Sequence, residues 1–108
     1  MGSEVPEMQE VQIVWEFTVR ADRIVEFVSA YGNDGDWVRL FRRAEGFHGA
    51  ELLCAVDDPC RFLTVDRWEN TGRYAQFHEQ FGAEYRALDA RLVGITLSEK
   101  KLGTFTTA

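Results

Sequence analysis

The chain has 108 residues, which is room for one domain built around one hydrophobic core. Eighteen acidic residues against twelve Lys and Arg give a formal net charge of −6. The summed field of such a chain repels phosphate backbones and anionic membrane surfaces, so neither nucleic acid nor a membrane is expected as a partner. The 45% hydrophobic fraction includes eight Phe, three Tyr and three Trp, enough to fill a core and also to line a cavity.

The two cysteines and the N-terminus carry no targeting or metal signal. Cys54 and Cys60 lie outside any CxxC or metal-ligand spacing, so neither a disulfide framework nor a metal site is predicted. The first ten residues, MGSEVPEMQE, lack the charged start and apolar run of a signal peptide. We therefore expect a cytoplasmic protein with reduced thiols and a flexible tail over residues 1–10.

Residues 11–20, VQIVWEFTVR, alternate between apolar and polar side chains, a period of two that predicts a β-strand. One face of this strand would carry Val11, Ile13, Trp15, Phe17 and Val19. Asp22 can then cap a helix over residues 22–31, in which apolar residues recur at helical spacing. The turn-forming GNDG at residues 32–35 ends that helix, and residues 36–44 predict a shorter one.

Two short apolar runs, residues 49–56 and 61–69, predict the strands of a hairpin. The connection between them contains Asp58 and Pro59, which suit the first two positions of a type I turn. Residues 93–105 predict the last strand of the chain.

Between the hairpin and the last strand, Asn70 or Thr71 starts a long helix that runs to Leu92. At 100° per residue its apolar side chains share one direction, as expected for a helix lying on a sheet. These side chains are Tyr74, Phe77, Phe81, Tyr85, Leu88 and Leu92. His78 falls at the edge of this stripe.

The order of elements is β-α-β-β-α-β, the ferredoxin-like α+β arrangement, with both helical layers on one face of a four-stranded antiparallel sheet. Such a sheet alternates cleanly when its second face meets water. The second and third strands are instead apolar on both faces. Because no further element remains to cover the second face, we expect a homodimer that packs sheet against sheet.

The strands and helices predicted in this order also carry recognisable sequence stretches. They are WEFTV in the first strand, DWVRLFRRAEGFHGAELL, DDPCRFLTVDRWEN, the helix start GRYAQFHEQF, and a last strand that closes with Leu102, Gly103 and Phe105. Together they resemble the antibiotic biosynthesis monooxygenase (ABM) family of dimeric α+β barrels, over residues 11–105. The clearest matches are the run that ends in Glu45, Gly46 and Phe47, Trp68 at the end of the third strand, and Phe77 on the following helix.

The resemblance implies a homodimer with one cavity in each subunit, used by some members for cofactor-independent oxygenation of polyketide-type phenols and quinols. Other members degrade haem, and they carry a strand asparagine, a helix tryptophan and a haem-ligating histidine. Here the first strand has no asparagine, Phe77 stands at the tryptophan position, and Arg86 and Ala87 stand near the ligand position. Haem degradation is therefore disfavoured, and no cofactor is expected.

Oxygenation without a cofactor needs a base that deprotonates an electron-rich substrate, a dry pocket, and donors that stabilise the resulting anion. His78 is the first candidate for the proton acceptor, because an imidazole titrates near neutral pH. Asp66 is a second base or the group that orients the imidazole. Tyr74 or Tyr85 would donate to the developing oxyanion.

Each candidate also has a structural interpretation. His78 would be a boundary residue satisfied by a backbone carbonyl or water. Asp66, a carboxylate among apolar neighbours, would form a salt bridge with Arg20 or near Arg67. The tyrosine hydroxyls would bond to nearby backbone groups.

Aromatic residues would hold a flat ligand or simply fill the core. Trp68 and Phe77 are expected to position the substrate ring, and the remaining predicted wall residues are Trp15, Trp37, Phe41 and Phe81. Core packing is the ordinary role of an aromatic stripe at helical spacing. The functional alternatives are therefore a monooxygenase acting on a small aromatic compound and a binding or regulatory module that holds a metabolite without chemistry.

Overall fold

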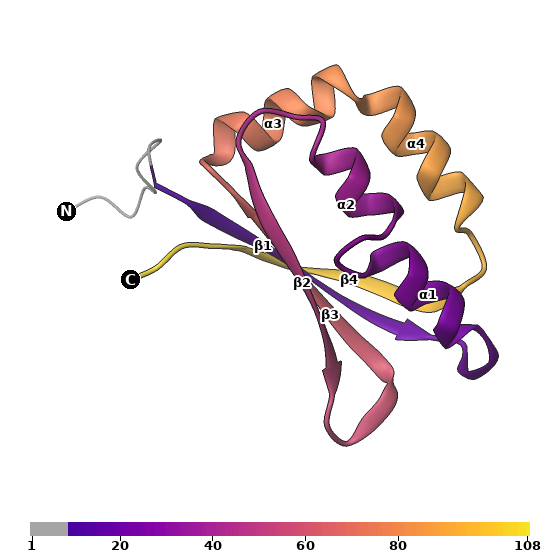
Figure 1. Cartoon of the computed structure of the whole chain (residues 1–108). Coiled ribbons are helices and arrows are strands. Elements are labelled where there is room, and N and C mark those ends of the chain that lie inside the picture. The colour runs from indigo at the N-terminus through magenta and orange to yellow at the C-terminus, as the bar shows by residue number, and fades with distance from the viewer. Residues whose placement is uncertain (1–8) are drawn as a thin grey trace.

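The computed structural model describes residues 9–108, so most of the predicted N-terminal tail lies outside the described residues. Four antiparallel strands form one sheet in the order β2-β3-β1-β4, and the helices lie on one face of it (Figure 1). The strands are β1 Val11–Val19, β2 Phe47–Ala55, β3 Asp58–Trp68 and β4 Thr96–Phe105. The helices are the short 3-10 turn η1 Ala21–Arg23, then α1 Ile24–Tyr31, α2 Asp36–Phe41, α3 Thr71–Gln80 and α4 Gly82–Arg91. The ferredoxin-like α+β prediction is confirmed.

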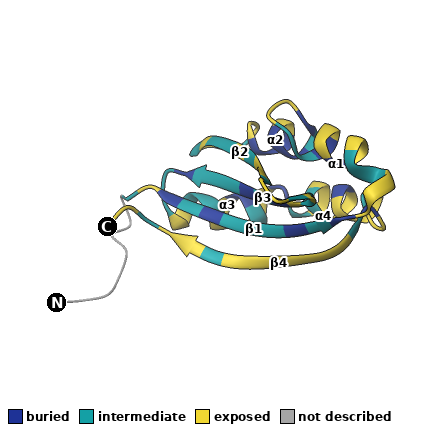
Figure 2. Ribbon diagram, turned by 90° about the horizontal axis from the view of Figure 1, so that it is seen from below, coloured by how far each residue is buried: buried dark blue, intermediate teal, exposed yellow. Residues whose placement is uncertain are grey.

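β1 lies in the middle of the sheet, and its alternation decides which side chains meet the helices. Burial follows the predicted face: Val11, Ile13, Phe17 and Val19 are buried, and Trp15 is half-buried. The same face continues on β3, since Phe17 pairs with Phe62 and Trp15 pairs with Thr64. β4 forms an edge strand that is largely exposed (Figure 2).

The long helix predicted to run to Leu92 is two helices. α3 ends at Gln80, Phe81 has φ −116° and ψ 21°, and α4 begins at Gly82. Glycine is a poor helix former and costs about 1 kcal/mol relative to alanine there. The bend lets both halves keep their apolar side on the sheet, because Phe77 and Leu88 are both buried.

The two predicted helix starts have different outcomes. The sequence left the start of α3 open between Asn70 and Thr71; α3 begins at Thr71, and the Asn70 side chain caps it by accepting a hydrogen bond from the Arg73 backbone N–H at 2.8 Å. The prediction for Asp22 is wrong: this residue lies inside η1, and Arg23 precedes α1 without a side-chain cap.

The predicted hairpin forms, but its turn is displaced. β2 ends at Ala55, which pairs with Asp58, so only Val56 and Asp57 make the connection. Asp58 and Pro59 therefore belong to β3 and not to a type I turn. The Asp58 side chain instead accepts a hydrogen bond from the Cys60 backbone N–H at 2.9 Å, a local interaction typical of aspartate near turns.

The side of the sheet turned away from the helices carries an apolar group that we call the outer-face patch: Val14, Leu53, Leu63 and Val65. Val14 pairs with Val65 across β1 and β3, and Leu53 pairs with Leu63 across β2 and β3. Leu53 is 45% exposed. These strands are thus apolar on both faces, as the sequence predicted. Among the described residues, no helix is long and apolar enough to cross a membrane.

Candidate functional site

A cavity lies between the sheet and the helices, where the two parts of the core meet. Trp15 and Tyr31 pack against both core clusters and also line the cavity. The cavity has a volume of about 60 Å³ and is partly open to solvent. Such a volume holds a few water molecules, so wall side chains must move apart to admit an aromatic ligand. The lining residues are Trp15, Phe17, Tyr31, Trp37, Val38, Phe41, Ala50, Thr64, Asp66, Tyr74, Tyr85, Asp89 and Glu99.

Asp66 is the carboxylate set deepest among the apolar wall residues. It lies on β3 opposite Ile13 of β1 and Ala50 of β2, so its cross-strand neighbours cannot bond to it. Asp66 is half-buried and lines the cavity. Burial raises the pKa of Asp66 from 3.8 to about 7.

The salt bridge predicted for Asp66 is absent from residues 9–108. Arg67 pairs instead with Glu51 on the outer face, and the Arg20 guanidinium donates to the Gly94 carbonyl. Because Arg67 is the residue next to Asp66 on a strand, its side chain points to the opposite face. Asp66 is left with no ionic partner in the part of the chain that the structure describes.

Three tyrosines bring hydroxyl groups to the same cavity. Burial raises the pKa of Tyr31, of Tyr74 and of Tyr85, and nearby carboxylates raise each pKa further. All three therefore remain protonated at neutral pH and can donate hydrogen bonds. Tyr31 also lies close to the Trp37 indole N–H, which lowers the pKa of Tyr31 slightly, yet this N–H makes no hydrogen bond of acceptable geometry.

His78 lies behind the cavity wall rather than in it. Its ring packs between two wall residues, edge-on to Tyr74 at 4.5 Å and tilted against Tyr85 at 4.9 Å between ring centroids. Burial lowers the pKa of His78, and the positive charge of Lys101 lowers it further. The imidazole is thus neutral at physiological pH, but it does not line the cavity.

The predicted aromatic residues divide into two groups. Trp15, Trp37 and Phe41 line the cavity, as do the predicted polar candidates Tyr74, Tyr85 and Asp66. Trp68, Phe77 and Phe81 do not, and they are 0%, 1% and 9% exposed. Their rings contact one another and Phe41, in the order Phe41, Trp68, Phe77 and Phe81. They support the wall from the core.

Several lining residues were missed by sequence reasoning. Asp89 lies one helical turn after Tyr85, so the apolar stripe of α4 could have indicated it. Glu99 pairs with Phe17 across β1 and β4 and therefore faces the helices. Register shifts interrupt this pairing between Val14 and Trp15 and near Thr18, and they hide the orientation of Glu99 from the sequence pattern.

Comparison with models of protein families finds no match, and comparison with curated protein sequences finds none either. Comparison with solved structures is informative. The fold is that of ABM-type α+β proteins. The order of strands and helices, and the helical layer on one face of the sheet, agree with this result.

The structures that show this fold include SnoaB from Streptomyces nogalater, described as a cofactor-independent oxygenase. It has a TM-score of 0.71 and 20% sequence identity, over 93% of this chain and 94% of that chain. A proposed antibiotic biosynthesis monooxygenase from Bordetella bronchiseptica has a TM-score of 0.73 and 17% identity, over 93% and 98% of the two chains. Another from Nitrosomonas europaea has a TM-score of 0.70 and 19% identity, over 96% and 94%. These likenesses establish the fold.

Proposed function

We propose that the protein is a homodimeric ABM-family monooxygenase that oxygenates a small phenolic or quinol compound of polyketide type without a cofactor. The observation that carries this proposal is the Asp66 carboxylate at the wall of an aromatic-lined cavity, with no ionic partner in the described part of the chain. The fold shared with SnoaB, a cofactor-independent oxygenase, supports it.

Asp66 is the group best placed to take the proton. A general base works best when its pKa lies near the working pH, and burial holds the pKa of Asp66 at about 7. Deprotonation leaves a phenolate or enolate that is rich enough in electrons to reduce O₂. When a CH₂ carbon is oxidised to a carbonyl, the substrate supplies all four electrons, one oxygen atom stays on the substrate, and the other leaves as water.

The tyrosines and tryptophans have supporting roles. Tyr74 and Tyr85 are protonated donors that can stabilise the substrate oxyanion. Trp15, Trp37 and Phe41 would hold the ring in a cavity that excludes most water. His78, which packs behind Tyr74 and Tyr85, is a positioning residue in this scheme.

Oxygen uptake tests the proposal and separates the two candidate bases. We expect O₂ consumption with at least one compound of an anthrone and hydroquinone panel, measured with an oxygen electrode. Because His78 lies behind the wall, His78→Ala is expected to lower kcat by about tenfold or less, well below the loss on removal of a general base. Ligand-induced thermal shifts without any O₂ uptake would instead favour the non-catalytic binding module.

The homodimer gives a separate prediction about the outer-face patch. Two ion pairs, Arg61 with Glu16 and Arg67 with Glu51, flank the patch and give it the apolar centre and polar rim of an interface. Leu63→Arg would bury an unpaired charge there, and we expect it to weaken the dimer about a hundredfold.

Analytical ultracentrifugation at micromolar concentration measures this effect. Val25→Arg is the matched control, because Val25 is 84% exposed on α1 and lies on the helical side. A wild-type protein that sediments as a monomer under these conditions would rule out the dimer.

A further inference from the structure

The charged residues that line the cavity are all acidic. Asp66, Asp89 and Glu99 contribute carboxylates, and no Lys, Arg or His of residues 9–108 lines the cavity. Asp66 lies deep on β3, whereas Asp89 and Glu99 are exposed and stand at the mouth. Both mouth residues lie near the hydroxyls of Tyr31 and Tyr85, and the negative charge of each therefore raises the pKa of both tyrosines.

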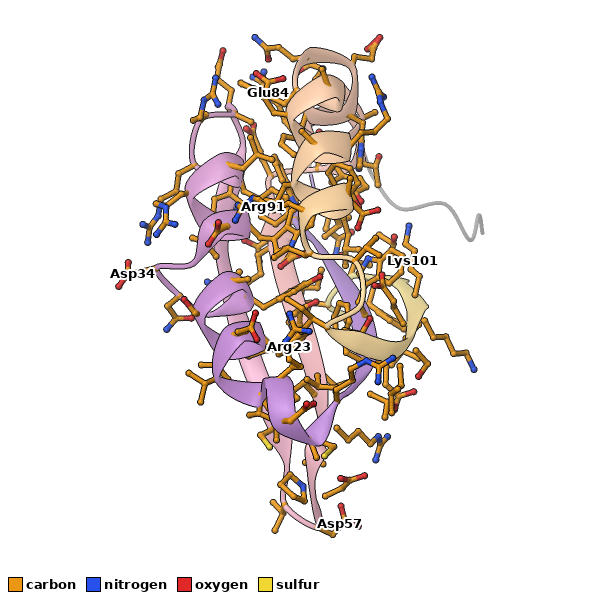
Figure 3. The ribbon with its side chains drawn as sticks, turned by 90° about the vertical axis from the view of Figure 1, so that its right-hand side faces the viewer. Arg23, Asp34, Asp57, Glu84, Arg91 and Lys101 are labelled. Atoms are coloured by element: carbon orange, nitrogen blue, oxygen red, sulfur yellow. The ribbon has the colours of Figure 1, made fainter. Side chains whose placement is uncertain are left out.

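None of these three carboxylates has an ionic partner among residues 9–108, whereas most other acidic side chains there do. Two arginines of the helical layer are occupied by other carboxylates: Arg91 pairs with Asp36, and Arg43 pairs with Glu84 at 3.5 Å. Figure 3 shows Glu84 and Arg91 on the side of α4 that faces α2. These pairs hold α4 against α2 and leave Asp89 free.

Lys101 is a basic residue that lies beside the cavity wall without lining the cavity. The Nζ of Lys101, on β4, lies 5.9 Å from the centre of the Tyr74 ring and forms no ion pair within the described residues. Within residues 9–108 no three His, Cys, Asp or Glu side chains are grouped so that they could hold a metal ion. Asp89 and Glu99 are therefore free to bind a cationic group of a ligand.

The walls between the mouth and Asp66 are aromatic. Trp37 and Tyr85 pack with ring centroids 4.9 Å apart, and Tyr31 lies 6.0 Å from Trp37. Aromatic faces attract organic cations, and the attraction grows when water is excluded. The Trp37 indole N–H is buried beside the Tyr31 hydroxyl and has no well-formed hydrogen bond among the described residues.

We propose that the cavity selects phenols that carry a protonated amine, with the ammonium group bound by Asp89 and Glu99 and the phenol hydroxyl directed to Asp66. This inference rests on the proposed function and names the substrate class of the same site.

Calorimetric titration with three matched phenols tests the selection. The probes are tyramine, which is cationic, 4-ethylphenol, which is neutral, and 3-(4-hydroxyphenyl)propanoate, which is anionic. We expect tyramine to bind about tenfold more tightly than 4-ethylphenol, through the two carboxylates and the aromatic faces together. The anionic probe is expected to bind most weakly.

Variants then locate the effect. The double variant Asp89→Asn, Glu99→Gln is expected to bring the affinity for tyramine to within about twofold of the affinity of the same variant for 4-ethylphenol. Glu79→Gln is the matched control, because Glu79 is an exposed, unpaired carboxylate on α3 outside the cavity lining. Equal binding of the three probes, no binding of any of them, or a preference that survives the double variant would overturn the inference.

The oxygen electrode separates this inference from the proposed function. Selective tyramine binding without O₂ uptake on any phenol or quinol would support the charge selection and remove the oxygenase. O₂ uptake on a quinol by a protein with no preference for tyramine would keep the oxygenase and overturn the charge selection.

Discussion

Asp66→Asn is expected to slow oxygen uptake strongly and, above neutral pH, to stabilise the fold. Burial raises the pKa of Asp66 in the folded protein from 3.8 to about 7. Between these two values the folded chain binds a proton that the unfolded chain has released, so the free energy of unfolding falls as pH rises through this window. Above pH 7 the buried charge of Asp66 lowers the free energy of unfolding by its full amount. Asparagine carries no charge, so the variant does not lose this stability.

The size of this effect follows from the shift. Three pKa units correspond to about 4 kcal/mol, and the contact of Asp66 with water in the cavity reduces this, so we expect about 2 kcal/mol. Loss of the general base is expected to lower kcat by about 10² to 10⁴. The residue would thus reduce stability while it serves the reaction, as functional groups often do.

Urea unfolding of wild type and variant, near pH 4 and near pH 8, measures the stability difference. The two proteins are expected to be nearly equal near pH 4, and the variant more stable near pH 8. Glu79→Gln is again the control, since an exposed carboxylate shifts stability by less than about 0.5 kcal/mol. An identical pH dependence in wild type and Asp66→Asn would mean that Asp66 is not buried as the structure places it.

Phe77→Ala is expected to destabilise the fold by about 3 to 5 kcal/mol. Phe77 is 1% exposed, and its ring packs against Phe41 at 5.1 Å and Trp68 at 5.3 Å between centroids. Since small domains have a free energy of unfolding of about 5 to 15 kcal/mol, this loss is a large part of the total. The cause is the cavity left where the ring was.

Urea unfolding followed by circular dichroism measures this loss, with Phe77→Leu as a milder variant if Phe77→Ala does not fold. Val25→Ala, at a position that is 84% exposed, serves as the control and is expected to change stability by less than about 0.5 kcal/mol. A Phe77→Leu protein of wild-type stability that no longer binds phenols would restore the role in substrate positioning predicted from the sequence.

The sequence alone predicted most of the fold, because the relevant signals are local. Alternation in β1 identified the buried face, which includes Phe17, and helical spacing identified the buried side of α3 and α4. The start of α3 was predicted at Asn70 or Thr71, and the structure adds the capping hydrogen bond of Asn70, which spans three residues. The bend at Phe81 was missed, since a glycine within an apolar stripe does not reveal whether packing will tolerate it.

The residues that face the cavity were decided by tertiary structure. His78 and Asp66 were both candidates in the sequence, but only the packing of α3 on β3 leaves His78 behind the wall and Asp66 in it. Glu99 enters the cavity through irregular pairing of β4 with β1. Periodicity shows which residues of an element share a face, whereas the neighbours of that face come from segments distant in the chain. The composition thus showed a surplus of aromatic residues. Only the three-dimensional structure shows that carboxylates without an ionic partner among residues 9–108 lie between these aromatic side chains.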